Sequence, residues 1–307
     1  PGHIQLSIDA FEDFLSRYKG LKPDTIRNQT DAVQRFFSVN SISCLKDISL
    51  SHIEYGFAQS GQKEVYKSAM RKYLDFLFQE GTIEADLGEV LPMILPRIPN
   101  SYPLPSVYTD EEIRAILGSI DRSTVQGSRD FAILMLASSL GIRASDICEM
   151  TLEAINFVKN ELSFIQKKTS VPLTLPLLPD VKEALLGYLG YRKIDSTDEP
   201  IFIQCRAPYH KLTRMGIWTI MRRYVKQSGV DPGHRKRGTH ALRSSLASSM
   251  IREQVPYYAV QKILGHESPQ STKNYVRIDI GRLREFTLPV PEAYGRFDAF
   301  LKGGETR

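Results

Sequence analysis

Apolar residues recur at helical spacing through the first hundred positions of the chain. The spacing predicts two helices with inward faces made of Ile8, Phe11, Phe14, Leu15 and Tyr18 in the first and of Ile26, Val33, Phe36 and Phe37 in the second. A third helix is predicted over residues 62–80, with Gly81 just past its end as a stop signal. These three segments predict a small helical domain.

A proline-rich passage, LPMILPRIPNSYPLP at residues 91–105, interrupts the helical pattern. Repeated prolines remove backbone donors and favour extended chain, so we interpret the passage as the region that separates two domains. We assign residues 1–98 to the helical domain, 99–107 to the linker, 108–290 to a second domain and 291–307 to a C-terminal tail.

The second domain combines helices with a short stretch of strands. Thr109 and Glu112 form a capping-box pattern that opens a helix to about residue 120, and a strongly apolar helix over 129–140 ends at Gly141. Alternating segments at 155–157, 161–166 and 171–177 predict a small antiparallel sheet, and helical segments follow at 214–228, 239–253, 257–264 and 269–276. The predicted class is mainly α with a small antiparallel β-sheet (α+β).

Composition narrows the setting of this 307-residue chain. Its apolar runs stop short of the roughly 18 residues that a membrane span needs, and no secretory signal opens the sequence. The three cysteines are isolated and odd in number, which is typical of reduced, buried thiols in a cytoplasmic protein. The first residue is Pro1 rather than a methionine, which leaves room for an upstream domain.

Positive charge is concentrated in two places. Between Cys205 and Arg243 ten basic residues face a single acid, Asp231, and this imbalance favours a polyanionic partner. On the third helix three basic residues recur every four positions, a pattern that a plain solvated face explains at least as well. The candidate DNA contacts are Lys63, Lys67, Arg71, Arg214, Arg222, Arg223, Arg235, Lys236 and Arg237.

Reactive side chains stand at turns and helix ends, where a residue can be both held and exposed. They are Arg143, Lys167, Lys168, His240, Arg243, His266 and Tyr275. Each alone has an ordinary structural role, as a surface ion pair, a cap or a core aromatic. Together they fit phosphodiester transfer, because arginines stabilise phosphate charge with forked hydrogen bonds and a tyrosine can attack phosphorus.

Two competing chemistries fit the sequence less well. Metal-dependent hydrolysis wants clustered ligands, and Asp146, Glu149 and Glu153 recur near helical spacing without paired histidines. We expect Asp146 to orient Arg143 or to cap its helix. A GxxxxGK[ST] phosphate loop is absent, which argues against an ATP-driven motor.

The same segments resemble the tyrosine recombinases, the phage-type or lambda-type integrases. GIRASDI is similar to the box that carries the first catalytic arginine, at Arg143, and THALR to the His-x-x-Arg box, at His240 and Arg243. LGHESPQSTKNYV resembles the terminal box, with His266 and the nucleophile Tyr275. The hairpin lysine of the family falls on IQKKTSVPLTLP, where spacing favours Lys168 over Lys167 without deciding between them.

The resemblance implies a C-shaped clamp around duplex DNA and a 3′-phosphotyrosine intermediate. Arg143, Arg243 and His266 would hold the phosphate, Lys168 would protonate the departing 5′ oxygen, and His240 would either assist proton transfer or hold the phosphate. No cofactor, metal or ATP is implied. The implied partners are double-stranded recombination sites, three further copies in a tetramer on DNA, and an accessory directionality or DNA-bending protein. No membrane is implied, and the setting would be a bacterial or phage cytoplasm, with the nucleoid.

The subgroup and biological role remain separate questions. After Arg243 the family frequently has His-Thr and an aromatic, whereas this chain has Ser244, Ser245 and Leu246. We favour integration of a mobile element, partly because an arm-binding domain could precede Pro1. The alternatives are a Xer-like multimer resolvase, DNA relaxation like that of a type IB topoisomerase, and a non-catalytic DNA-binding regulator. The tail around Tyr294, Phe297, Phe300 and Leu301 is expected to pack on a neighbouring subunit.

Overall fold

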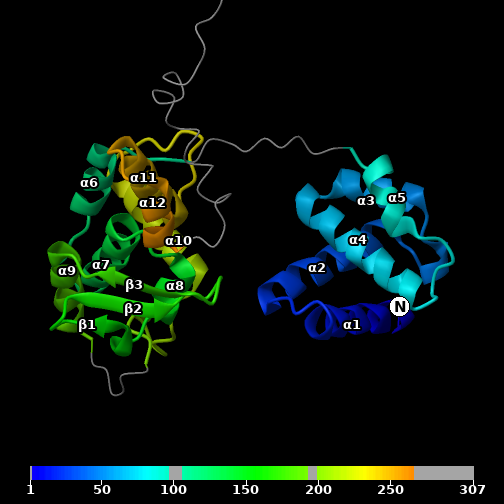
Figure 1. Ribbon diagram of the computed structural model, residues 1–307, viewed down its shortest axis with the longest axis horizontal. Coiled ribbons are helices and arrows are strands. Elements are labelled where there is room, and N and C mark those ends of the chain that lie inside the picture. Colours follow the sequence, from blue (N-terminus) through cyan, green and yellow to red (C-terminus); the bar gives the residue numbers. More distant parts are fainter. Residues whose placement is uncertain (1, 97–105, 193–198, 266–307) are drawn as a thin grey trace, which may run out of the picture. The chain divides into compact units, whose positions relative to one another are not determined.

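The computed structural model describes residues 2–96, 106–192 and 199–265. Backbone contacts divide the chain between Ser101 and Tyr102 into two compact units, each with its own core (Figure 1). The described residues are mainly helical with one three-stranded antiparallel sheet, so the predicted fold class is confirmed.

The first unit is entirely helical among its described residues. Its elements are α1 (Gly2–Arg17), α2 (Pro23–Asn40), a short 3₁₀ helix (Leu45–Asp47), α3 (Leu50–Gln59), α4 (Lys63–Gln79) and α5 (Leu87–Ile94). Helix α4 packs against each of the other four α-helices. The core is rich in aromatic rings, as the spacing predicts, with Phe11 meeting the edge of Tyr73 at 5.1 Å between ring centroids.

Two expectations for this unit were wrong. Tyr18, placed on the inward face of the first helix, lies beyond the end of α1 and is 78% exposed. The proline-rich passage does not begin as extended chain, because α5 continues to Ile94 with Pro92 inside it. Leu91 and Leu95 are buried in the core, and this apolar burial offsets the cost of an interior proline.

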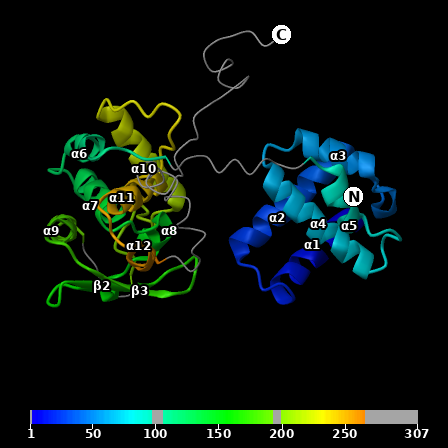
Figure 2. The ribbon, with the colours of Figure 1, turned by 45° about the horizontal axis from the view of Figure 1, so that its top comes forward.

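The second unit places a small sheet beside a bundle of helices. Its elements are α6 (Asp110–Gly118), α7 (Val125–Ser139), α8 (Ala144–Glu149), a 3₁₀ turn (Leu152–Ala154), β1 (Ile155–Asn156), β2 (Glu161–Ile165), β3 (Pro172–Pro176), α9 (Pro179–Leu189), α10 (Arg214–Gln227), α11 (Thr239–Arg252) and α12 (Tyr257–Leu264). Helix α7 is buried along most of its length and packs against α9 and α11. In both views the sheet lies at one side of this unit and α6 at the opposite side (Figures 1 and 2).

The sheet presents a two-lysine turn. Strands β2 and β3 pair antiparallel, with Leu162 opposite Leu175 facing the core and Ser163 opposite Thr174 facing outward. The chain between them carries Lys167 and Lys168, as predicted. Of the three cysteines, only Cys148 is buried, so the expectation that all are buried was wrong; Cys44 is exposed. Among the described residues, no helix is long and apolar enough to cross a membrane.

Candidate active site

A glycine turn delivers Arg143 to the site. Helix α7 ends before Gly141, whose φ of +63° lies in the left-handed region that glycine adopts without steric cost. A side chain at this position would also be blocked, since a Cβ would lie 2.8 Å from a methyl carbon of Leu264. The chain then turns into α8, and Arg143 stands at its N-cap position, partly buried.

The two predicted arginines both donate hydrogen bonds to carbonyls at the end of α12. Arg243 on α11 is 2% exposed, and its guanidinium donates to the carbonyls of Gly141 and Leu264, each at 2.5 Å. Arg143 donates from Nη2 to the carbonyl of Gly265 at 3.3 Å. Terminal carbonyls of a helix lack intrahelical partners and carry partial negative charge, so they hold guanidinium groups well. Residues about a hundred positions apart therefore meet at one point.

One nitrogen of this pair is left without a partner. Nη1 of Arg143 is buried and has no hydrogen-bond acceptor among the described residues. Buried donors in folded proteins are almost always paired, so an orphan guanidinium nitrogen is a place where a bound anion would be expected.

The turn between β2 and β3 is tied to the same point by Asp146 and Gln166. Asp146 accepts a hydrogen bond from the backbone N–H of Lys167 at 2.8 Å, so it holds the hairpin rather than capping α8. Gln166 is 1% exposed, accepts from Thr169 at 2.8 Å and donates weakly to the carbonyl of Leu264 at 3.4 Å. Composition and spacing gave no reason to single out Gln166.

Asp146 is a buried acid among cations. Burial raises its pKa, while the Lys167 N–H and the charges of Arg143 and Arg243 act in the opposite direction. Its second carboxylate oxygen has no hydrogen-bond partner among the described residues. Asp146 therefore contributes a nearby negative charge to both arginines and fixes the backbone of the hairpin.

The two hairpin lysines differ in their surroundings. The ammonium of Lys167 lies 2.5 Å from Glu149 Oε1, and Lys211 approaches the other oxygen of Glu149 at 2.7 Å. Lys168 is exposed, and its charge is one of those that act on His240. The two lysines therefore differ, since Lys167 is paired with Glu149 whereas the charge of Lys168 acts on His240.

His240 lies in the first turn of α11, within reach of the charges of Arg143, Lys168 and Arg243. Desolvation by surrounding protein lowers the pKa of His240, and the positive charges of Arg243, Lys236, Lys168 and Arg143 lower it further. Four of the six predicted catalytic residues are thus brought together.

The other two predicted catalytic residues, His266 and Tyr275, lie outside the described residues. The described chain reaches Gly265, whose φ of +59° makes a left-handed cap at the end of α12. A Cβ here would lie 2.4 Å from Nε2 of Gln166, so the position requires glycine on two grounds. Its carbonyl is the group that Arg143 holds, which places the chain next to both arginines immediately before His266.

The predicted DNA contacts on α4 have internal partners. The ammonium of Lys63 donates to the carbonyls of Phe57 and Ala58, where α3 ends. Lys67 donates to Leu95 and Pro96, just past the end of α5. These contacts favour the structural interpretation of the stripe, in which lysines neutralise helix C-termini. Arg71 is exposed.

The basic stretch of the second unit is divided in the same way. Arg223 lies 3.3 Å from the buried carboxylate of Asp130, and Arg235 forks onto Glu112 at 2.6 and 2.7 Å. Arg214, Arg222, Lys236 and Arg237 are exposed, and Arg222 lies over the ring of Trp218 at 5.4 Å. Composition alone cannot separate these two sets.

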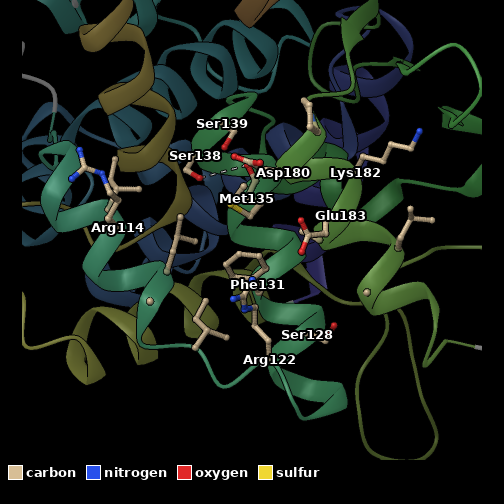
Figure 3. Close-up of a pocket in the computed structure, with 18 of the residues that line it drawn as sticks. Arg114, Arg122, Ser128, Phe131, Met135, Ser138, Ser139, Asp180, Lys182 and Glu183 are labelled. Carbon is tan, nitrogen blue, oxygen red and sulfur yellow. Dashed lines mark hydrogen bonds between the residues drawn. The ribbon is translucent and has the colours of Figure 1, made fainter.

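A broad groove in the second unit lies away from these residues. A groove of about 1250 Å³ is bounded by α6, α7 and α9, with Phe131 and Met135 on its floor and Arg114, Asp180 and Glu183 at its rim (Figure 3). None of the described candidate catalytic residues lines it. Within the described ranges, no three His, Cys, Asp or Glu side chains gather as metal ligands would.

Comparison with known proteins gives concordant similarities. Residues 106–282 match the phage integrase family. The tyrosine recombinase XerC of Thermodesulfovibrio yellowstonii is 30% identical over 296 residues, which cover 92% of this chain and 95% of that protein.

Solved structures match in fold. The XerH site-specific recombinase in its post-cleavage complex with difH DNA aligns with a TM-score of 0.71 and 18% identity, covering 91% of this chain and 83% of that one. A lambda integrase dimer bound to a COC′ core site aligns with a TM-score of 0.68 and 22% identity, covering 94% and 99%. At such identities the likeness establishes the fold alone.

Proposed function

Because this chain belongs to the phage integrase family, we propose that it is a site-specific DNA recombinase that cuts and rejoins strands through a 3′-phosphotyrosine at Tyr275. The match begins at residue 106, within the assigned linker, and ends at residue 282, beyond Tyr275. The XerC relative is named a tyrosine recombinase, and the XerH and lambda integrase structures contain DNA. These names support duplex DNA as the substrate.

Each described residue has a role that its surroundings allow. Arg143 and Arg243 would bind the non-bridging oxygens of the scissile phosphate, with His266 as a third donor. Lys168 would protonate the departing 5′ oxygen, and His240, whose lowered pKa favours the neutral ring, would assist proton transfer. The phosphotyrosyl ester conserves the energy of the broken strand, so resealing needs only attack by a 5′ hydroxyl.

The observation that carries the proposal is Nη1 of Arg143, which is buried and has no partner among the described residues, beside Arg243 and in a setting where Lys168 and Lys236 add positive charge around His240. Buried donors are usually paired, and among the described residues Nε of Arg192 is the one other guanidinium nitrogen that is buried without a partner. A phosphate oxygen would supply the missing acceptor.

The experiment uses DNA that the protein itself selects. Binding of the Tyr275→Phe variant to randomised duplexes would recover a preferred site, and that site with a nick beside the cleavage position would trap a covalent adduct. We expect an SDS-resistant adduct with the wild-type chain and with Tyr258→Phe, an exposed tyrosine on α12, and none with Tyr275→Phe. An adduct that survives in Tyr275→Phe would remove Tyr275 from its role.

For the biological role we propose integration of a mobile element, acting as a tetramer on DNA with an accessory directionality or DNA-bending protein, at the nucleoid. Multimer resolution is the second candidate, favoured by the match to 95% of the XerC relative. A plasmid with two copies of the selected site tests both against simple relaxation. Two-site products support a recombinase, whereas relaxation without exchange would support topoisomerase-like activity.

A further inference from the structure

The loop that leads into α11 is hydrogen-bonded to the first described residues of the second unit. Ser106 accepts a hydrogen bond from the N–H of Lys236 at 3.0 Å, and the hydroxyl of Tyr108 donates to the carbonyl of Lys236 at 3.2 Å. Both backbone groups of Lys236 are therefore held. Glycines at 233 and 238 flank this point, so the loop has conformational freedom that these contacts remove.

Arg235 completes the connection from the other side. Its guanidinium lies over the ring of Tyr108 at 4.4 Å from the centroid and donates to the carbonyl of Val107 at 3.2 Å. It also forks onto Glu112, which closes the capping box of α6 with Thr109. The hydrogen bond and charge of Arg235 lower the pKa of Glu112, so the pair is charged at neutral pH. The ion pair of Arg235 with Glu112 therefore joins the first turn of α6 to the loop before α11.

The same segment reaches α11 beyond His240. The N–H of Tyr108, a residue 3% exposed, donates to Ser245 Oγ at 2.7 Å. On the opposite side, a Cβ added to Gly238, the N-cap of α11, would lie 3.0 Å from the ring of Trp218. The start of α11 is therefore fixed on both sides of His240.

We propose that Arg235, Tyr108 and Glu112 form a brace that positions Lys236 and His240 at the reacting phosphate, and that Arg235 acts within the protein rather than on DNA. The inference rests on the proposed function. Without the fork to Glu112, the loop could swing and carry the ammonium of Lys236 away from His240. Displacement of a catalytic group by about 1 Å can cost about 100-fold in rate.

The electrostatic surroundings of His240 supply a readout that a purely structural role would not move. The charges that face the ring are Arg243 on its own helix, Lys236 on the loop, Lys168 on the hairpin and Arg143 before α8, and all are positive. If Lys236 moves away, the pKa of His240 rises. Loss of the Glu112 carboxylate by itself would not raise it, because removing a negative charge lowers the pKa of any nearby histidine.

The test compares Glu112→Gln, Arg235→Lys and Tyr108→Phe with the control Glu111→Gln, whose acid is exposed and faces Arg114 at 3.6 Å. The DNA is the selected, nicked duplex described above. We expect the three brace variants still to bind the DNA and to form the covalent adduct between about 10- and 100-fold more slowly once bound. Glu111→Gln should match wild type in both.

A second measurement needs no cleavage. The pKa of His240, followed by NMR titration of its ring in the full chain, should rise in Glu112→Gln and Arg235→Lys and stay unchanged in Glu111→Gln. An Arg235→Gln variant that loses about 0.9 of the log–log salt slope but cleaves normally once bound would make Arg235 a phosphate contact and overturn the inference. Unchanged cleavage and an unchanged His240 pKa in all three variants would overturn it as well. A wild-type chain that forms no adduct would defeat the proposed function instead, and the NMR comparison would still decide the brace.

Discussion

Replacing Gly265 by alanine should damage the protein twice, once in the backbone and once in packing. A non-glycine residue at the φ of +59° costs about 1 to 2 kcal/mol. The added Cβ would also displace the buried Gln166, which accepts a hydrogen bond from Thr169 and donates one to the carbonyl of Leu264. The loss of each bond costs about 1 kcal/mol. The expected loss is about 3 to 4 kcal/mol of the free energy of unfolding.

Gly229 supplies the matched control. Its φ is +73°, but nothing lies within 4 Å of a Cβ added there, so Gly229→Ala carries the backbone cost alone. Urea unfolding followed by the fluorescence of Trp218, the single tryptophan of the chain, reports the second unit selectively. At a slope of about 2 kcal/mol/M, we expect the Gly265→Ala midpoint to lie about 1 M below that of Gly229→Ala.

The same substitution should reach the chemistry, because the Gly265 carbonyl accepts from Arg143. We expect adduct formation to fall about 100-fold in Gly265→Ala and to stay normal in Gly229→Ala. Combining Gly265→Ala with Gln166→Ala should recover part of the lost stability, since the two changes share one contact. Equal midpoints for the two alanine variants would refute the packing argument.

Three further results are expected. Asp130→Asn leaves the guanidinium of Arg129 buried without its counterion and should lower the free energy of unfolding in urea by about 3 to 5 kcal/mol. The control Glu183→Gln, on the exposed side of α9, should change it by no more than about 0.5 kcal/mol. A small loss for Asp130→Asn would mean that the ion pair is dispensable. Arg222→Gln should reduce the log–log salt slope of DNA binding by about 0.9. Arg223→Gln should leave that slope unchanged and lower the free energy of unfolding instead, because Arg223 pairs with Asp130. The reverse pattern would contradict this assignment. Because the pKa of His240 is lowered in the folded chain, the unfolded chain binds a proton at this residue first as the pH falls below about 6.5. The stability that the neutral His240 contributes is therefore present above that pH and is lost below it. His240→Gln should flatten that part of a curve of stability against pH, and an unaltered curve would show that the pKa is not lowered.

Strong periodicity made the long helices predictable, and weak local signals hid the short ones. Helices α1, α2, α4, α6 and α7 have apolar faces or capping signals that are visible in the sequence. Helix α5 was hidden by Pro92, because its stability comes from the tertiary burial of Leu91 rather than from propensity. Helices α3 and α9, ten and eleven residues long, were missed although Ser49 and Pro179 mark their starts, whereas the similarly short α6 was visible through its capping box.

The features of the candidate site also divide into those that local sequence reveals and those that it does not. Arg143, His240 and Arg243 stand beside helix ends and glycines, so local sequence was enough to single them out. The hydrogen bond from Lys167 to Asp146 and the seat of Gly265 on Gln166 join segments that are distant along the chain, and no local pattern encodes them. Counting basic residues could not separate exposed residues from those with partners inside the protein, because charge content does not reveal that Glu112 pairs with Arg235 and Asp130 with Arg223.

The arrangement explains how a cationic site can be rigid before any DNA arrives. Several positive charges in one place repel one another, and in water their side chains would separate. Here Arg243 and Arg143 are held by carbonyls at the end of α12, Asp146 supplies one buried negative charge, and the hairpin is tied to that acid through a backbone bond. Backbone acceptors fix the guanidiniums without neutralising them, so the positive potential needed for a phosphate survives. Glycine is required at 141 and 265 for a separate reason, since both have positive φ and a Cβ would collide with Leu264 at the first position and with Gln166 at the second.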